Sequence, residues 1–189
     1  MAIKVAINGF GRIGRCTLRA IYEQGLQNEF DVVAINASGD LATNSHLLKY
    51  DTTHGRFRTS VETEGENCII IDGKKIAFYN TKNPKDINWA DHGVDLLLEC
   101  TGAYTTKAKA QALLDQGAKR VLISAPGGDD VDTTIVVGVN ESALKADMTV
   151  VSNASCTTNC LAPVAKILSD AIGIKQGLMT TIHAYTNDQ

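Results

Sequence analysis

The sequence predicts an α/β protein with a doubly wound, mostly parallel sheet, followed by the first helix and strand of a second domain. Three observations support this fold class. Residues 3–8 are a short apolar run that leads directly into a glycine-rich turn and then into a helical pattern. Residues 94–100 are almost continuously apolar, as in a strand that is covered on both faces. Strand-like and helix-like segments alternate along residues 1–152, which is the order that builds a parallel sheet.

The glycine-rich turn has the spacing G-x-G-x-x-G, with Gly9, Gly11 and Gly14 at its three glycine positions. Between a strand and a helix, this spacing is the fingerprint of a Rossmann-type dinucleotide-binding domain. Gly9 permits a tight turn, Gly11 lets the backbone approach a pyrophosphate, and Gly14 lets the helix pack closely on the strand. The helix amino terminus adds amide donors and a partial positive charge. We therefore expect a nicotinamide dinucleotide at this turn.

The second strand, residues 31–36, ends where such domains usually place an acid that bonds the adenosine ribose. This chain has Asn36, Ala37 and Ser38 there. Without a carboxylate, the 2′-phosphate of NADP is not repelled, and Ser38 with the loop amides can accept it. No lysine or arginine follows in the next ten residues to clamp that phosphate, and Asp40 is an alternative ribose partner. We expect tolerance of NADP, with or without NAD.

The rest of the predicted sheet follows in order. Residues 41–50 predict a helix with Leu47, Leu48 and Tyr50 facing inward. The dipeptide at 72–73, Asp-Gly, predicts a two-residue hairpin turn. The remaining expected elements are hairpin strands at 68–71 and 76–79, a helix at 107–117, and strands at 94–100, 120–123, 134–139 and 148–152.

Polar residues follow several of these strands. Thr101 and Ser124 come directly after two of them, at the edge where parallel sheets bind ligands. Asp129, Asp130 and Asp132 predict a solvated acidic loop rather than a metal site.

The catalytic prediction centres on residues 152–160, with the sequence Ser-Asn-Ala-Ser-Cys-Thr-Thr-Asn-Cys. Ser155 is the expected N-cap of a helix, which places Cys156 in the first turn, where the helix dipole favours a thiolate nucleophile. Residues 177–183 predict a strand that ends at His183. A helix start and a returning strand end can meet, so His183 is the expected base or imidazolium partner of Cys156. The alternative is a buried structural cysteine and an unrelated histidine.

Composition, net charge and cysteine content restrict the classes of protein to which this chain can belong. The chain has 189 residues, 44% hydrophobic and 21% charged, which is ordinary for a globular protein. A net charge of -3 argues against a main role on nucleic acid or on a membrane surface. Five scattered cysteines favour reduced thiols in the cytoplasm, and their spacing predicts no metal site. We also expect no secretory leader and no membrane span.

Three motifs together resemble the phosphorylating glyceraldehyde-3-phosphate dehydrogenases: residues 9–14, 155–160 and 183–189. Residues 47–51 and 124–127 add to the resemblance, which runs from end to end. It implies that Cys156 attacks the aldehyde of glyceraldehyde 3-phosphate to give a thiohemiacetal. Hydride transfer to NAD or NADP then leaves a thioester that inorganic phosphate cleaves to 1,3-bisphosphoglycerate. His183 would assist the thiolate and act as base on the hemiacetal hydroxyl.

The resemblance also assigns binding residues. Substrate or phosphate contacts fall on Ser155, Thr157 and Thr186. Cofactor contacts fall on Gly9, Gly11, Arg12, Ile13, Gly14, Asn36, Ala37, Ser38, Lys82, Thr101 and Ser124. Many members have aspartate where this chain has Ala37, and the sequence Asn-Ala-Ser is similar to the NADP-preferring, gluconeogenic branch. Lys82 stands where many members have arginine. Lysine keeps the positive charge but lacks the planar guanidinium that can form two parallel hydrogen bonds.

Two domains are expected: a dinucleotide-binding domain at residues 1–152, and the start of a catalytic domain at residues 153–189. In the second, Pro163 is expected to kink the helix. Family chains are much longer and form cytoplasmic homotetramers, so the segment alone is expected to bind cofactor weakly and to turn over little. The alternatives are an erythrose-4-phosphate dehydrogenase and a non-catalytic nucleotide-binding module.

Overall fold

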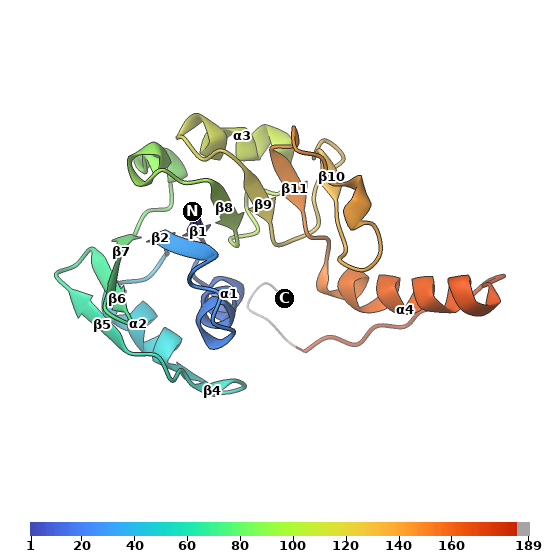
Figure 1. The fold of residues 1–189 in the computed structure, drawn as a ribbon, viewed down its shortest axis with the longest axis horizontal. Helices are drawn as coiled ribbons and strands as arrows, with labels where there is room; N and C mark the ends of the chain where they lie inside the picture. The colour runs from blue at the N-terminus through green and yellow to red at the C-terminus, as the bar shows by residue number, and fades with distance from the viewer. Residues whose placement is uncertain (185–189) are drawn as a thin grey trace.

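The computed structural model describes residues 1–184 of the chain (Figure 1). Nine strands form one sheet in the order β10-β11-β9-β8-β1-β2-β7-β6-β5. The strands are β1 (Ile3–Asn8), β2 (Phe30–Asn36), β5 (Val61–Glu64), β6 (Cys68–Ile71), β7 (Lys74–Tyr79), β8 (Leu96–Glu99), β9 (Val121–Ile123), β10 (Thr133–Thr134) and β11 (Val150–Ser152). All neighbouring pairs from β10 to β7 are parallel, and only the β7-β6-β5 end is antiparallel. The predicted fold class, a mostly parallel α/β sheet, is confirmed.

Helices cover both faces of this sheet. The helices packed on it are α1 (Arg12–Glu23), α2 (Leu41–Lys49) and α3 (Lys107–Asp115), whereas α4 (Cys156–Ile172) follows the sheet without packing on it. Leu18 of α1 and Leu48 of α2 belong to one buried cluster with Ile7 of β1. Leu113 of α3 belongs to a second cluster with Ala6. Since successive residues of a strand point to opposite faces, Ala6 and Ile7 place the two cores on opposite sides of the sheet.

The hairpin turn matches its prediction, whereas α3 ends at Asp115, two residues before the predicted end. The turn at Asp72 and Gly73 has φ values of 53° and 76°, the left-handed pair that a two-residue hairpin favours. Gly117 follows the end of α3 with φ of 98°. A Cβ at Gly117 would lie 2.7 Å from the backbone nitrogen of Ala90, so both the turn and the packing require glycine.

The inward face of α2 differs from the prediction. Leu48 is buried, but Leu47 and Tyr50 are exposed. The buried residues of the helix are Leu41, Asn44, Ser45 and Leu48. Their spacing is that of one helical face, and Leu47 falls outside it. The polar residues Asn44 and Ser45 lie on this buried face, so the positions of the apolar residues alone do not predict which face of α2 is buried. Tyr50 begins β3 (Tyr50–Asp51), which pairs with β4 (Gly55–Arg56) in a small separate hairpin.

The strand expected at 134–139 is mostly a loop, with only Thr133 and Thr134 in β10. The side chain of Asn140 explains this difference. Its Oδ1 accepts a hydrogen bond from the Val136 amide at 2.8 Å, and its Nδ2 donates to the Thr134 carbonyl at 2.9 Å. A side chain that occupies backbone groups in this way competes with strand pairing.

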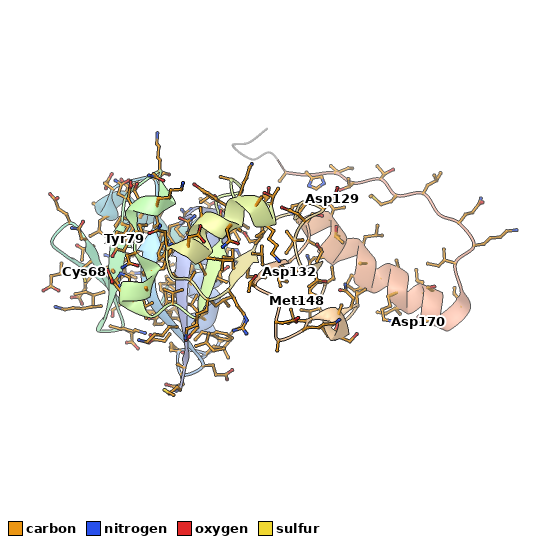
Figure 2. The ribbon with its side chains drawn as sticks, turned by 90° about the horizontal axis from the view of Figure 1, so that it is seen from above. Cys68, Tyr79, Asp129, Asp132, Met148 and Asp170 are labelled. Atoms are coloured by element: carbon orange, nitrogen blue, oxygen red, sulfur yellow. The ribbon has the colours of Figure 1, made fainter. Side chains whose placement is uncertain are left out.

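The acidic loop is solvated at Asp129 and Asp130, as predicted, whereas Asp132 is partly buried. Asp130 accepts hydrogen bonds from the Lys107 and Ala108 amides, so it caps the first turn of α3. Asp132 forms an ion pair with Lys107 and accepts the Thr149 amide at 2.8 Å, and Figure 2 shows it among the side chains of the sheet end. These contacts hold the pKa of Asp132 at about 2, chiefly through the Lys107 ammonium. Both carboxylates are therefore structural.

The chain after β11 forms α4, which continues through Pro163 to Ile172. Figure 2 shows this helix, with Asp170 near its end, extending away from the sheet. No residue of α4 is buried. Its exposed apolar side chains are Leu161, Val164, Ile167, Leu168 and Ile172. The strand predicted at 177–183 is absent from the described residues, and this segment runs extended and exposed beside α4 (Figure 1).

No helix in the described part of the chain combines the length and apolar character needed to cross a membrane. Within residues 1–184, no group of three or more histidine, cysteine or acidic side chains is placed to hold a metal ion.

Candidate functional site

The turn between β1 and α1 is shaped by its three glycines. Gly9 has φ of 99°, and a Cβ there would lie 2.6 Å from the backbone nitrogen of Thr101. A Cβ at Gly14 would lie 2.2 Å from the Gly9 carbonyl oxygen, so α1 packs on this turn only because position 14 has no side chain. A Cβ at Gly11 would meet nothing within 4 Å. The space beside Gly11 is thus open, which is the condition that close approach of a ligand to this backbone requires.

The turn opens into a cavity of about 980 Å³ at the carboxyl ends of β1, β2 and β8. Nine of the predicted cofactor residues line it: Gly9, Gly11, Arg12, Ile13, Asn36, Ala37, Ser38, Lys82 and Thr101. Residues that the sequence reasoning did not single out also line it: Asn8, Phe10, Arg15, Leu47, Thr81, Cys100, Ala103 and Tyr104. The cavity lies at the sheet edge where parallel α/β folds bind ligands.

The first turn of α1 faces this cavity without a side-chain cap. Gly11 is the N-cap and offers no side chain, and Arg12 and Ile13 are the first two helical residues. Their amides are among those that an α-helix leaves without an intrahelical acceptor. Such a terminus suits a phosphate, because the amides and the dipole both favour negative charge.

The Arg12 side chain is directed toward β3 and binds Asp51, with Nη1 3.0 Å from Oδ2. The Thr53 and His54 amides also donate to Asp51, at 2.8 and 2.9 Å. These amide bonds, together with the Arg12 guanidinium, hold the pKa of Asp51 well below its usual range. Arg12 therefore joins the start of α1 to the β3–β4 hairpin.

Directly after β2, Ala37 is buried and Ser38 is exposed. Asp40 is the N-cap of α2: its two oxygens accept from the Thr43 amide at 2.7 Å and from the Thr43 hydroxyl at 2.8 Å. Each carboxylate oxygen of Asp40 thus already has one partner within α2. Lys82 lines the same cavity as Ser38, because it follows β7, the strand that pairs with β2. A cation therefore reaches this region from outside the stretch in which the sequence reasoning looked for one.

A chain of buried polar groups lies beneath the cavity. Glu99, at the end of β8, accepts hydrogen bonds from Asn8 and Thr101, and Asn8 accepts one from Asn36. Glu99 is fully buried, and this burial raises the pKa of its carboxyl group. Sequence reasoning missed Asn8 and Glu99 as site residues. The available signal was a charged residue directly after the three leucines of the largely apolar run at 94–100.

Ser124 lies at the end of the next strand, β9. Its hydroxyl donates to the Glu99 carbonyl oxygen at 3.0 Å. The following loop is held by Ser152 of β11, a buried residue whose hydroxyl donates to the Ala125 carbonyl at 2.7 Å and accepts from the Gly127 amide at 3.0 Å. Ser152 is a third residue, after Asn8 and Glu99, whose role the sequence did not reveal.

The segment after β11 carries the predicted nucleophile. Ala154 has φ of 58°, a left-handed conformation that costs energy for a residue with a Cβ and turns the chain sharply into α4. Ser155 is the N-cap, and its Oγ accepts from the Thr158 amide at 3.0 Å, so this prediction is confirmed. Cys156 is the first residue of α4 and is exposed. Since β11 runs parallel to β9, β8 and β1, Cys156 follows the same sheet edge that carries the glycine turn.

His183 returns to this helix start even though no strand carries it there. Its Nε2 lies 3.3 Å from the Thr157 hydroxyl and 2.7 Å from the Thr181 hydroxyl. The His183 imidazole and Cys156 thus lie at the same end of α4, because His183 contacts Thr157, the residue that follows Cys156. Thr186, predicted to contact substrate, lies outside the described residues.

Comparison with known proteins agrees with this architecture. Residues 3–107 match the family model for the NAD-binding domain of glyceraldehyde 3-phosphate dehydrogenase, and residues 155–189 match the model for its C-terminal domain. The plasmid-encoded glyceraldehyde-3-phosphate dehydrogenase of Cupriavidus necator is 56% identical over 189 residues, which are 100% of this chain and 56% of that protein.

Two further relatives show the same pattern of coverage. The glyceraldehyde-3-phosphate dehydrogenase of Cereibacter sphaeroides is 58% identical over 100% of this chain and 55% of its own length. Glyceraldehyde-3-phosphate dehydrogenase 2 of Bacillus subtilis is 50% identical over 100% of this chain and 54% of its own length. The chain thus spans about half the length of the curated relatives it matches. Because the match to the NAD-binding domain model extends over more than half of its residues, this chain belongs to the glyceraldehyde-3-phosphate dehydrogenase family.

Proposed function

We propose that the whole protein is an NAD(P)-dependent phosphorylating aldehyde dehydrogenase that converts glyceraldehyde 3-phosphate and inorganic phosphate to 1,3-bisphosphoglycerate. In this proposal, residues 1–152 are the dinucleotide-binding domain and residues 153–189 begin the catalytic domain. The observation that carries it is the start of α4. Cys156 occupies its first position and His183 reaches its first turn, on the sheet edge that also carries the glycine-lined cavity.

The cavity fits a nicotinamide dinucleotide. The open space beside Gly11 lets a pyrophosphate approach the backbone, and the uncapped amides at the start of α1 face a phosphate. Ala37, Ser38 and Lys82 would border the adenosine end, and Thr101 and Ser124 the strand ends toward Cys156. When bound, the nicotinamide ring supplies the acceptor for a hydride.

In the proposed reaction, the Cys156 thiolate adds to the aldehyde carbon, and the His183 imidazolium donates a proton to the resulting alkoxide, which gives a thiohemiacetal. His183 accepts the proton of the new hydroxyl as the hydride leaves the same carbon, which yields a thioester on Cys156. A phosphate oxygen then attacks the thioester carbon, the carbon–sulfur bond breaks, and the thiolate is regenerated with release of the acyl phosphate. The positive end of α4 stabilises negative charge on both the sulfur and the developing oxyanion.

Substrate contacts are proposed for Ser155, Thr157 and Thr186. The Thr157 hydroxyl lies within hydrogen-bond range of His183, so one side chain can link the base and a substrate oxygen. The Ser155 hydroxyl is engaged with the Thr158 amide, and its lone pairs and proton leave capacity for a further contact.

For the cofactor, we propose that NADP is accepted, alone or with NAD. Ala37 places no carboxylate against a 2′-phosphate, and Asp40 is committed to capping α2. Lys82 supplies a cation at the same cavity. A preference of this kind would fit a gluconeogenic direction of flux.

We propose that the whole protein is a cytoplasmic homotetramer in which further chain covers the apolar face of α4. The greater length of the relatives and the five exposed apolar side chains of that helix support this arrangement. The 189-residue chain alone is expected to bind cofactor weakly and to turn over little.

The test measures kcat/KM of the whole protein with glyceraldehyde 3-phosphate and phosphate, with NAD and NADP in separate assays. Cys156→Ser is expected to lower kcat by about a thousandfold or more, while Cys160→Ser, on the same exposed helix, stays within about threefold of the parent. A higher kcat/KM with erythrose 4-phosphate would reassign the substrate. If neither aldehyde reduces either cofactor, the enzyme proposal fails and a nucleotide-binding module takes its place.

A further inference from the structure

The buried carboxylate of Glu99 starts a continuous chain of hydrogen bonds that crosses three strands beneath the cavity. Glu99 Oε2 accepts from Asn8 Nδ2 at 2.6 Å. Asn8 Oδ1 accepts from Asn36 Nδ2 at 2.8 Å. Asn36 Nδ2 also donates to the Thr81 carbonyl at 3.1 Å, and Asn36 Oδ1 accepts from the Thr81 amide at 3.1 Å. The chain therefore runs from the end of β8 to the segment that follows β7.

The carboxylate sets the direction of every amide in this chain. A carboxylate only accepts hydrogen bonds, so Asn8 must present its NH₂ group to Glu99 and its oxygen to Asn36. Asn36 must then present its NH₂ group to Asn8, which leaves its oxygen for the Thr81 amide. Asn8, Asn36 and Glu99 are all buried, so a reversed amide would leave donors facing one another away from water.

Both ends of the chain reach the wall of the cavity. At one end, Asn36 holds both backbone polar groups of Thr81, whose neighbour Lys82 also lines the cavity. At the other end, Glu99 Oε1 accepts from the Thr101 amide at 2.7 Å and from the Thr101 hydroxyl, which in turn accepts from the Ala103 amide at 3.0 Å. One buried carboxylate thus holds two loops on opposite sides of the same cavity.

We propose that Glu99 is a positioning residue for the cofactor cavity. Through Asn8 and Asn36 it fixes the Thr81–Lys82 segment, and through its direct bonds it fixes the loop after Thr101. This inference rests on the proposed function in that the cavity holds the nicotinamide dinucleotide. Glu99 itself does not line the cavity, so it acts through the residues it orients.

Glu99→Gln tests the direction of the chain while keeping the size of the side chain. If its NH₂ group faces Asn8, then Asn8 and Asn36 must both reverse, and the Thr81 amide loses its acceptor. If its NH₂ group faces Thr101 instead, the Thr101 amide loses its acceptor. In the whole protein, we expect hydrogen exchange of the Thr81 or the Thr101 amide to rise about tenfold, and the Kd for NADH and NADPH to rise about tenfold, with kcat within about threefold. Glu66→Gln, in the exposed turn between β5 and β6, is the matched control and leaves all these values unchanged.

The double variant Asn8→Asp with Glu99→Gln restores the pattern with the same net charge. One oxygen of the new aspartate accepts from the glutamine and the other accepts from Asn36, so Asn36 regains its direction toward Thr81. We expect exchange of the Thr81 and Thr101 amides to return to within about threefold of the parent. Exchange is the readout for this variant, because residue 8 lines the cavity and a carboxylate there also acts on a bound phosphate. A role limited to filling space at position 99 would not be rescued in this way.

The outcomes separate the two proposals. Unchanged exchange of both the Thr81 and the Thr101 amides in Glu99→Gln, or no recovery of exchange in the double variant, overturns the positioning role. If the single variant does not fold, the double variant alone decides the matter, because faster Thr81 exchange in it overturns the role and parental exchange supports it. If the parent binds neither NADH nor NADPH while Thr81 exchange still follows the variants, the hydrogen-bond chain stands and the proposed cofactor function fails.

Discussion

Replacing Gly14 with alanine is expected to destabilise the first strand–turn–helix unit. A Cβ at this position would lie 2.2 Å from the Gly9 carbonyl oxygen and 3.1 Å from Ile7 Cγ2. Real Cβ contacts essentially never fall below 3.0 Å, so the start of α1 must move away from the turn by several tenths of an ångström. The obstructing atom belongs to the backbone, so no side-chain rotation relieves the contact. We expect a loss of about 2 to 3 kcal/mol in unfolding free energy, or about 4 to 12 °C in Tm.

Gly11→Ala is the matched control within the same turn. Its Cβ would meet nothing within 4 Å, so the unfolding free energy is expected to stay within about 1 kcal/mol of the parent. The methyl group would instead occupy the space where a pyrophosphate approaches, so the Kd for NADH and NADPH is expected to rise about tenfold or more. Urea unfolding followed by circular dichroism, and cofactor titration by fluorescence, measure the two effects. Equal stability of the two variants would refute the packing argument, and unchanged affinity of Gly11→Ala would refute the cofactor placement.

Three other predictions concern reactivity, pH and the core. Iodoacetamide at neutral pH is expected to modify Cys156 at least about tenfold faster than Cys100, because Cys156 is exposed whereas burial raises the pKa of Cys100 to about 11; equal rates by mass spectrometry would contradict this. Asp132 has a pKa of about 2 in the folded chain against about 4 unfolded, so its stabilisation is present above pH 4 and is lost toward pH 2. The variant Asp132→Asn is expected to be less stable at pH 7, and its unfolding free energy in urea is expected to fall less between pH 4 and pH 2. The same pH dependence of the unfolding free energy in variant and parent would count against the ion pair. Leu18→Ala is expected to cost about 2 to 5 kcal/mol in unfolding free energy, and Leu161→Ala, on exposed α4, under about 0.5 kcal/mol; a similar loss in both would be inconsistent with the cores described above.

The elements that the sequence predicted well depend on neighbours within a few residues. The turn from Gly9 to Gly14 and the cap at Ser155 are such cases, because spacing alone sets their geometry. The hairpin at Asp72 and Gly73 is another, since its turn type follows from two adjacent residues. The fold class was accessible for a related reason: buried parallel strands carry continuous apolar runs that can be recognised one at a time.

The features that escaped prediction depend on which strands become neighbours. Asn8 and Glu99 are 91 residues apart in sequence, and their contact requires β8 to lie beside β1. Asp132 seemed solvated because neither α3 nor β11 is near it in sequence. His183 was expected at the end of a strand, yet it reaches α4 through an extended segment without strand pairing among the described residues. Tertiary neighbours, rather than local propensity, decided each of these cases.

The outer strands of the sheet bear on how this molecule behaves in concentrated solution. An exposed strand edge offers free backbone groups on which another chain can assemble, and this is a common start of aggregation. Here one edge is β10, with only two residues, and the other is β5, where Glu62 and Glu64 are exposed. Lys75 pairs with Glu64, so the second edge is lined with charge of both signs. Such edges disfavour the pairing of a further strand, so contacts between molecules are expected to form through side-chain surfaces instead.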